Sequence, residues 1–567
     1  MAPTTAAPLR RPTPMDQLAN HLLDAQVTRS PILATYLGIK GFDAALDDYS
    51  PEAEEDRAGV AQRALANLGR TQPKDSVDQV TAAAMRDQLN LQVELHQAGE
   101  YTRNLNNVES PIQQVRDVFD LMPKQTTEDW ASITRRLAAI PASLDSYRRS
   151  LQLSQRHGIL PAARQVRVGI EQCEDLTGPK GTLAQLAALG AAIVDTPLAK
   201  DLAVATSQAQ QAYADLAEYL ASSLGRAAPE QDGVGRERYQ LLSRSFIGSV
   251  LDLDQTYHWG LEQLDAIIAE QEELAATLYG PGTTVQQAYL QLDQDPRYLI
   301  DSKAGLEKYM NEVSGQAMAA LDGQHFDIPE PIKHLVGRIA PSATGGIYYT
   351  APTEDFSRPG TMWWSVPPGV DRFHTWRERT TVYHEGVPGH HLQLGVATYV
   401  ADLLNRWRRM GIWVSGHGEG WALYAEALMG ELGFLDDPGD RMGMLDAMRL
   451  RATRVALDIG VHLGKTFPKR WGGQGETWNA QNAHHFLRSN VAMDASFVDF
   501  ELDRYLGWPG QAPSYLVGMR HWQSLRAAAE SRPGFDLKTF HDRALRLGAL
   551  PLAVLDQAIL EVDDAGQ

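Results

Sequence analysis

The chain has 567 residues, 43% of them apolar and 22% charged, and its formal net charge is −19 at pH 7. This acidic character disfavours nucleic-acid binding, because such affinity comes largely from Lys and Arg that displace counterions from phosphates. The single cysteine, Cys173, excludes an internal disulfide and a cysteine-based zinc site. Any zinc site therefore has to use histidines and carboxylates.

Residues 1–15 are rich in Ala, Thr, Pro and Arg and lack the apolar run of a signal peptide. We expect them to form a disordered tail. The sequence also lacks a run of about 18 apolar residues, the length of a transmembrane helix. We therefore expect no membrane association and residence in the cytoplasm.

Residues 16–337 form an N-terminal region of predicted amphipathic helices, with apolar residues at spacings of three and four. Near residue 338 the pattern changes. Two runs of aromatic and β-branched residues, 345–351 and 361–366, flank a turn-rich segment and predict an antiparallel hairpin, the alternative being an irregular loop. Helix is expected again after Pro368. Residues 338–567 thus form a second predicted region, which contains the hairpin and the later helices.

The segment HEGVPGHH begins at His384. In the zinc-protease pattern His-Glu-x-x-His the two histidines lie one helical turn apart, but here Pro388 occupies that position. Proline disrupts the helical ladder and Gly389 permits unusual dihedrals, so a bulge of about two residues would bring His390 back over His384. The alternative is a helix that ends at Pro388, followed by a surface pair, His390 and His391.

The segment 418–433, GEGWALYAEALMGELG, predicts a helix with Gly433 as its C-cap. Glu419 lies in the predicted first turn, and Glu426 lies seven residues later on the same face. Glu419 is either an acid that favours the helix dipole or the third ligand of a His, His, Glu zinc set with an open position. In the second case Glu426 would hydrogen-bond a ligand histidine.

Several segments together resemble the bacterial domain-of-unknown-function family 885. The match is weak in the N-terminal half, through PIQQVRDVFDLMP (111–123). The segments that carry the resemblance are HEGVPGHHLQ (384–393), GEGWALYAE (418–426), YYTAPTEDFSRPGT (348–361), RATRVALDIGVHLG (451–464), ELDRYLGWPGQAPSYLVG (501–518) and FHDRALRLGALPLAVL (540–555).

That family is similar to the helical zinc peptidases thimet oligopeptidase, angiotensin-converting enzyme and carboxypeptidase Taq, which carry His-Glu-x-Gly-His. Dipeptidyl peptidase III has one more residue in this motif. In each, glycine directly precedes the second ligand histidine, so the resemblance implies His390 rather than His391, although the spacing here is longer. It also implies a mainly α-helical, two-lobed metallopeptidase-like fold, with a small antiparallel sheet and the metal at the floor of a deep cleft. Residues 338–567 would be its catalytic region, with the lobes interleaved in one compact unit.

The resulting hypothesis is that His384, His390 and Glu419 hold Zn²⁺ and that Glu385 is the general base. Manganese or cobalt would also suit this ligand set. The peptidases use a Tyr or His from C-terminal helices as oxyanion donor, which implies this role for Tyr515 and His462; a buried tyrosine and a salt-bridged histidine are the alternative. The residues expected to support the ligands and donors are His391, Glu426 and Asp458.

The strand predicted at 345–350 is expected to lie along the cleft, where Tyr348 and Tyr349 would meet an extended peptide. Arg358 would bind a substrate carboxylate, the alternative being an ordinary loop arginine. We predict a zinc peptidase that acts on short peptides. The alternatives are a zinc hydrolase of another amide or ester, and a non-catalytic helical scaffold without metal. The sequence leaves the oligomeric state open.

Overall fold

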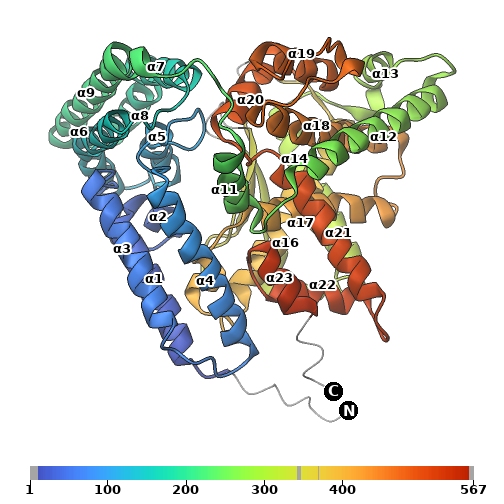
Figure 1. The fold of residues 1–567 in the computed structure, drawn as a ribbon, viewed down its shortest axis with the longest axis horizontal. Coiled ribbons are helices and arrows are strands. Elements are labelled where there is room, and N and C mark those ends of the chain that lie inside the picture. The colour runs from blue at the N-terminus through green and yellow to red at the C-terminus, as the bar shows by residue number, and fades with distance from the viewer. Residues whose placement is uncertain (1–9, 341–345, 368, 561–567) are drawn as a thin grey trace.

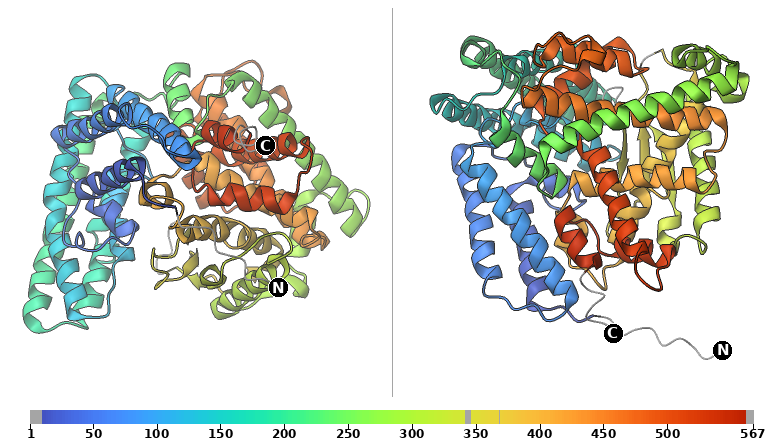
Figure 2. Two further views of the ribbon diagram at one scale, coloured as in Figure 1. Left: turned by 90° about the horizontal axis from the view of Figure 1, so that it is seen from below. Right: turned by 45° about the vertical axis from the view of Figure 1, so that its right-hand side comes forward.

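The computed structural model describes residues 10–340, 346–367 and 369–560. Helices make up most of this structure, as the sequence predicts. Figure 1 shows helices α1 to α9 gathered on one side and the later helices on the other, and the views of Figure 2 keep this arrangement. The expected division into two lobes around a deep cleft stays a prediction.

The helices before the first paired strand are α1 (Pro14–Arg29), α2 (Pro31–Tyr36), α3 (Pro51–Leu68), α4 (Ser76–Gln97), α5 (Pro111–Leu121), α6 (Thr127–Arg156), α7 (Ala163–Thr177), α8 (Thr182–Ala191), α9 (Thr196–Tyr219), η1 (Leu220–Leu224), α10 (Gly225–Ala227), α11 (Arg236–Ile247), α12 (Leu253–Tyr279), α13 (Val285–Leu292) and η2 (Pro296–Tyr298). Around the sheet lie α14 (Lys303–Leu321) and η3 (Glu330–Lys333).

The C-terminal helices are α15 (Thr375–Glu385), α16 (His390–Tyr399), η4 (Trp407–Gly411), α17 (Ser415–Glu431), α18 (Pro438–His462), η5 (Lys469–Trp471), α19 (Ala480–Asn490), α20 (Ala495–Gly507), α21 (Ser514–Glu530), α22 (Leu537–Arg546) and α23 (Leu552–Leu560). Among the described residues, none of these or the earlier helices combines the length and the apolar composition needed to cross a bilayer.

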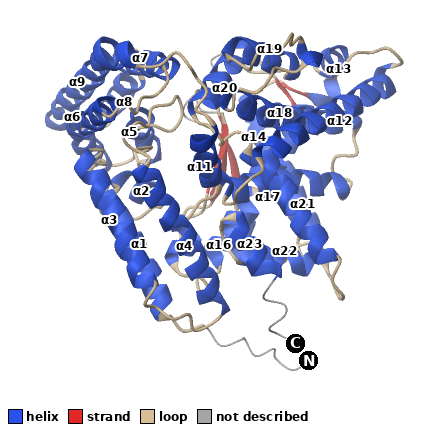
Figure 3. Cartoon of the chain, viewed as in Figure 1, coloured by secondary structure: helices blue, strands red, loops and turns tan. Residues whose placement is uncertain are grey.

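The small sheet lies near the middle of the molecule (Figure 3). The predicted hairpin is present: β3 (Ile347–Thr350) pairs antiparallel with β4 (Gly360–Trp364). A third strand, β2 (Leu335–Ile339), pairs parallel with β4, so the sheet is mixed and not antiparallel throughout. A short antiparallel pair, β1 (Leu299–Ile300) with β5 (Phe373–His374), lies apart from it.

The outer edge of β2 is satisfied by side chains of α14. Asn311 donates to the Gly337 carbonyl at 3.0 Å and accepts from its N–H at 2.9 Å, while Glu307 accepts from the Ile339 N–H. A buried strand needs partners for its backbone groups, and side chains supply them here. β3 forms the opposite edge of the sheet, where it pairs with no further strand of the described residues.

The hydrophobic core does not divide at residue 338. One large cluster joins Leu23 of α1 and Met85 of α4 to Trp421 of α17 and Leu555 of α23. A second cluster belongs mainly to α5–α9 and centres on Trp130. The change of pattern near residue 338 is therefore a change of secondary structure within one large core.

The expected N-terminal tail is shorter than the sequence suggests. Residues 1–9 lie outside the described residues, but residues 10–15 are ordered and Met15 is fully buried at the start of α1. The physical reason is a set of carboxylates that faces the chain here. Arg10 forms ion pairs of 2.5–2.7 Å with Asp16, Asp75 and Asp78.

Helices α17 and α21 touch backbone to backbone through three glycines. A Cβ on Gly518 would lie 2.1 Å from the carbonyl oxygen of Gly416, and one on Gly420 would lie 2.5 Å from the carbonyl carbon of Gly518. Only glycine permits so close an approach. This contact matters for the site because α17 carries Glu419 and α21 carries Tyr515.

Gly518→Ala should therefore lower the thermal unfolding midpoint by several degrees, because overpacking a rigid contact costs about 1–3 kcal/mol. Gly315→Ala is the matched control. Gly315 lies on the exposed face of α14 with open space around its Cβ position, so alanine should stabilise the helix slightly there. Equal midpoints for Gly518→Ala and wild type would contradict the backbone contact.

Candidate metal centre

The two histidines of the HEGVPGHH segment come together across a break between α15 and α16. Helix α15 ends at Glu385 and α16 begins at His390. Across the break, the Gly389 N–H donates to the Tyr383 carbonyl at 3.1 Å, an i→i−6 bond in place of the α-helical i→i−4 bond. The break thus absorbs two extra residues, as the predicted bulge requires.

Glycine is required at position 389. A Cβ there would lie 1.9 Å from the carbonyl oxygen of His384, so the chain of Gly389 packs directly on the end of α15. Trp421 of α17 fixes the same turn by donating its indole N–H to the Pro388 carbonyl at 2.9 Å. His390 and His391 are buried, which excludes the alternative of a surface pair.

Helix α17 begins three residues earlier than predicted, at Ser415, so Glu419 lies in its second turn and not its first. Gly416 and Gly418 both lie within this helix and face tight contacts. A Cβ on Gly416 would lie 3.0 Å from the Cα of Ile247, and one on Gly418 would meet the Trp413 ring at 2.2 Å. Gly433, with φ of +85°, follows the helix end as the predicted cap.

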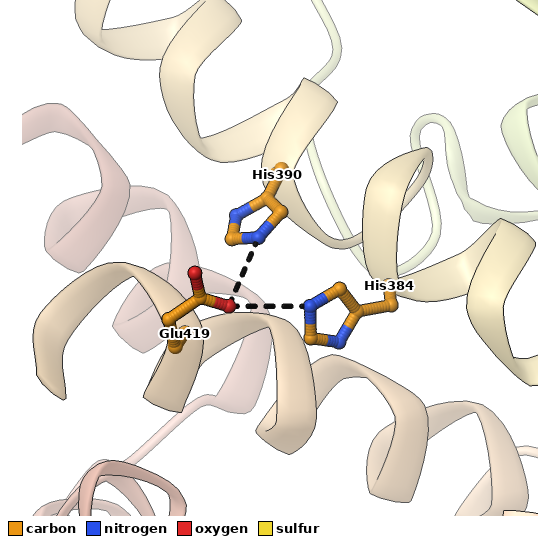
Figure 4. Close-up of side chains that lie close together, drawn as sticks. All are labelled: His384, His390 and Glu419. Carbon is orange, nitrogen blue, oxygen red and sulfur yellow. Dashed lines mark ion pairs between the residues drawn. The ribbon is translucent and has the colours of Figure 1, made fainter. Parts of the chain in front are cut away.

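His384, His390 and Glu419 form one cluster, in which the three ligand atoms lie within 4.8 Å of one another. Figure 4 shows both imidazoles directed at one carboxylate oxygen. Oε2 of Glu419 is 3.4 Å from Nε2 of His384 and 3.4 Å from Nε2 of His390.

These separations fit a shared metal ion better than hydrogen bonds. Good N–H···O bonds span about 2.7–3.2 Å. Ligand atoms at zinc bond lengths and tetrahedral angles are about 3.3 Å apart. The donor set of two imidazole nitrogens and one carboxylate, buried and free of cysteine, therefore suits Zn²⁺ or a similar divalent ion.

Glu426 holds the ring of His384 from behind. Its Oε1 lies 2.8 Å from Nδ1 of His384, and its Oε2 accepts from the Thr380 hydroxyl. This is the position predicted for Glu426, and it directs Nε2 of His384 toward Glu419. Burial alone would lower the pKa of His384, but Glu419 and Glu426 outweigh it and raise that pKa to about 10.

Glu385 lies beside the cluster without belonging to it. The side chain is 6% exposed, and its Oε2 is buried with no hydrogen-bond partner among the described residues. Burial raises the pKa of Glu385, against the opposing effect of His384 and His390. An unpaired buried carboxylate oxygen next to two histidines is poised to accept a hydrogen bond from a bound molecule.

His391 faces away from the cluster. Its Nε2 donates to the Ile332 carbonyl at 2.5 Å, and its Nδ1 accepts from the Tyr349 hydroxyl at 2.9 Å. Burial lowers the pKa of His391 to about 4, so the ring is neutral and each nitrogen serves one of these partners. His390, whose Nε2 faces Glu419, is the ligand candidate that the geometry favours.

Tyr515 lies against the cluster, as predicted. Its ring stacks on that of His384, with centroids 6.4 Å apart and planes at 18°. The hydroxyl accepts a long hydrogen bond of 3.4 Å from Arg504, and the guanidinium carbon of Arg454 lies 5.0 Å from the ring centroid. Burial first, and then Glu419, raise the pKa of Tyr515, so it is a neutral donor at physiological pH.

Asp458 and His462 do not orient each other as predicted. Asp458 accepts from the Tyr239 hydroxyl at 2.6 Å and from the Gly510 N–H at 3.0 Å. His462 bonds the Tyr505 carbonyl and stacks on Tyr239. Asp458 and His462 lie one helical turn apart on the same face of α18, but Tyr239 of α11 contacts both of them. It donates its hydroxyl hydrogen to Asp458 and stacks on the ring of His462. Through Gly510, Asp458 fixes the turn that leads into α21 and Tyr515.

The three residues predicted to contact substrate, Tyr348, Tyr349 and Arg358, do not face one common site in the structure. Tyr349 reaches inward to His391, whereas Tyr348 is 36% exposed and stacks on Trp363. Arg358 is exposed and donates to the Ala351 carbonyl of its own loop, which agrees with the alternative of an ordinary loop arginine.

Two residues near the cluster were not singled out from the sequence. Trp413 is 47% exposed, and its ring centroid lies 6.0 Å from that of His390. The guanidinium carbon of Arg451 lies 6.0 Å from the ring centroid of Tyr515. Arg451 is the first residue of one of the segments that carry the resemblance, so the sequence offered a signal for it. Trp413 lies just before α17 and belongs to none of those segments, so the sequence offered no signal for it.

A cavity of about 580 Å³ lies elsewhere, between the N-terminal helices, α11 and the end of α20. Its lining includes Tyr49, Arg103, Arg238 and Trp508, and none of the three cluster residues belongs to it. The ligand cluster is therefore distinct from this cavity, and the cleft expected above the metal stays a prediction.

His390→Ala should abolish binding of zinc, whereas His391→Ala should keep about one zinc per chain, since only His390 points a ring nitrogen at Glu419. Elemental analysis of the purified proteins after zinc addition measures this, and circular dichroism checks that both variants fold. Loss of zinc in His391→Ala alone would move the ligand to the other histidine.

Two solved structures share the fold. A "putative lipoprotein" from Colwellia psychrerythraea matches with a TM-score of 0.84 at 23% identity, over 97% of this chain and 99% of that one. A "putative lipoprotein of unknown function" from Shewanella oneidensis matches with a TM-score of 0.71 at 17% identity, over 97% and 100%. At these identities the likeness establishes the fold alone.

Comparison with curated proteins finds no match. Among protein families, the one described as "Bacterial protein of unknown function (DUF885)" matches residues 31–559, in agreement with the resemblance seen in the sequence. Because this match spans most of the chain, the protein belongs to the DUF885 family.

Proposed function

We propose that this protein is a metal-dependent peptidase, with zinc as the metal, that hydrolyses short peptides. The observation that carries the proposal is the cluster of two buried histidines, His384 and His390, with the partly buried Glu419, whose ligand spacing suits a tetrahedral metal ion. The unpaired oxygen of Glu385 and the hydroxyl of Tyr515 lie on residues next to it. A ligand set, a base and a donor are the three parts that metal-assisted hydrolysis needs.

A divalent ion in this cluster supplies a Lewis acid that polarises a carbonyl group and makes water a stronger nucleophile. The chain's own residues handle the protons. Glu385 accepts a proton from the attacking water at its free Oε2 and later passes it to the leaving amine. Tyr515 donates its hydroxyl hydrogen to the oxygen on which negative charge develops. Glu426 keeps His384 oriented throughout.

The edge strand β3 supports an extended peptide as substrate. Its outer side pairs with no strand of the described residues, and Tyr349 links the strand to His391, the neighbour of His390. An extended chain could add to this edge through main-chain hydrogen bonds. Residence in the cytoplasm remains a prediction from the sequence, because the two similar structures are of proteins described as lipoproteins.

Glu385→Gln should lower kcat by about 100- to 10,000-fold and leave the zinc content unchanged, because the amide keeps the volume but cannot accept a proton. A screen of short peptides followed by liquid chromatography measures turnover. Glu431→Gln, a surface carboxylate at the end of α17 that pairs with Arg526, is the control and should retain full activity. Full activity of Glu385→Gln would show that Glu385 is not the general base. A wild-type protein that takes up no zinc would instead favour the scaffold.

Tyr515→Phe should reduce kcat by about 100- to 1,000-fold with little change in KM, since the hydroxyl acts on charge that exists only in the transition state. Tyr279→Phe is the matched control, because Tyr279 is a partly buried tyrosine at the end of α12 that packs against a separate hydrophobic cluster. A normal kcat for Tyr515→Phe would show that the tyrosine only packs on His384.

A further inference from the structure

Positive charge gathers around Tyr515. Arg454 and Arg504 both pair with Glu501, at 2.8 Å and 3.1 Å, so two guanidinium groups share one carboxylate. Arg451 adds a third guanidinium within 6.0 Å of the Tyr515 ring centroid. In a chain with a net charge of −19, the gathering of three guanidinium groups next to the cluster of His384, His390 and Glu419 is a feature that requires an explanation.

Arg451 is the member of this group with no carboxylate at ion-pair distance, although its charge acts on the nearby Glu385 and Asp446. Its Nη1 donates to the Ala447 carbonyl of its own helix at 3.2 Å, and its Nε is buried without a hydrogen-bond partner. Among the described residues, none gives Arg451 an ion pair. Buried charges in proteins are normally paired, and a guanidinium presents a fork of donors that matches a carboxylate. The site therefore has room, in charge and in hydrogen bonding, for an anionic group of a ligand.

We propose that Arg451 binds the free α-carboxylate of a short peptide, so that the substrate class is peptides with a free C-terminus. This inference rests on the proposed function and specifies its substrate. The role differs from the one predicted for Arg358, whose guanidinium is exposed and bonds its own loop. Arg454 and Arg504 are held by Glu501, which leaves Arg451 as the arginine that can take a new partner.

The position of Arg451 also limits where such a peptide is cut. In the proposed mechanism Tyr515 donates to the oxygen of the bond that is cleaved, and the guanidinium carbon of Arg451 lies 6.0 Å from the ring centroid of the same tyrosine. An extended residue spans at most about 3.5 Å, so the bound carboxylate ends the peptide about two residues beyond that bond. The acidic surface of the rest of the protein repels anionic ligands, so Arg451, Arg454 and Arg504 also concentrate such ligands at the site.

Binding of uncleavable ligands tests this directly. Two versions of one tripeptide, in which a reduced bond replaces a peptide bond, would end in a free acid or an amide. Isothermal titration calorimetry on the zinc-loaded wild type should show the acid binding about 10- to 100-fold more tightly. In Arg451→Gln the acid should bind more weakly while the affinity for the amide stays the same, so that the two affinities become equal. Arg441→Gln, an exposed arginine of the same helix paired with Glu270, should keep the wild-type ratio.

Equal binding of acid and amide to the wild type, no detectable binding of the acid, or an unchanged ratio in Arg451→Gln would each overturn the role of Arg451. The wild-type comparison decides even if Arg451→Gln fails to fold. Hydrolysis of the parent peptides, followed by mass spectrometry, is a separate measurement. Selective binding of the acid without hydrolysis would overturn the peptidase function but keep the carboxylate site. Cleavage far from the C-terminus would overturn the proposed position of the peptide's C-terminal carboxylate relative to the cleaved bond.

Discussion

The contact of Gly389 with the end of α15 is the constraint on which the site depends. A regular helix would turn His390 well away from His384, because a separation of six residues is far from a whole number of turns. The i→i−6 hydrogen bond from Gly389 to Tyr383 removes this mismatch, and the missing side chain of Gly389 lets the backbone lie on the His384 carbonyl. Two histidine rings then meet with centroids 4.9 Å apart.

A second backbone contact brings the remaining groups to these histidines. Helices α17 and α21 approach through Gly416, Gly420 and Gly518. Glu419 from α17 can thus face both imidazoles while Tyr515 from α21 stacks on His384. Because side chains at such a contact would separate the helices, small residues here set the distance between a ligand and a donor. The geometry of the site is built from the absence of side chains as much as from their presence.

Electrostatics divides the surroundings of the cluster into two parts. On one side, Glu426 and Glu419 supply negative charge that orients imidazoles and suits a cation. On the other, Arg451, Arg454 and Arg504 supply positive charge, and Glu501 forms ion pairs with two of them, Arg454 and Arg504. A bound peptide would meet both parts, with a carbonyl group toward the cluster and an anionic end toward the arginines. This polarity gives the proposed substrate a direction in the site.

The sequence alone determined the elements with a local cause. Periodicity predicted the helices, aromatic and β-branched runs predicted β3 and β4, and the residue types of HEGVPGHH and GEGWALYAE predicted the cluster. Local reasoning also placed the start of α17 at Gly418, three residues too late. The contacts of Gly416 with Ile247 and of Gly418 with the ring of Trp413 are tertiary and do not show in the local pattern.

Only the tertiary structure decided contacts between distant segments. The strand β2 exists because Asn311 and Glu307 of α14 bond its outer edge. Residues 10–15 are ordered because Arg10 meets aspartates about 65 residues away. Asp458 accepts a hydrogen bond from Tyr239, and Arg451 lies beside Tyr515 with no ion pair among the described residues. Helical spacing fixes which side chains share a face, but the partner that the face meets is set by packing, which local pattern does not encode.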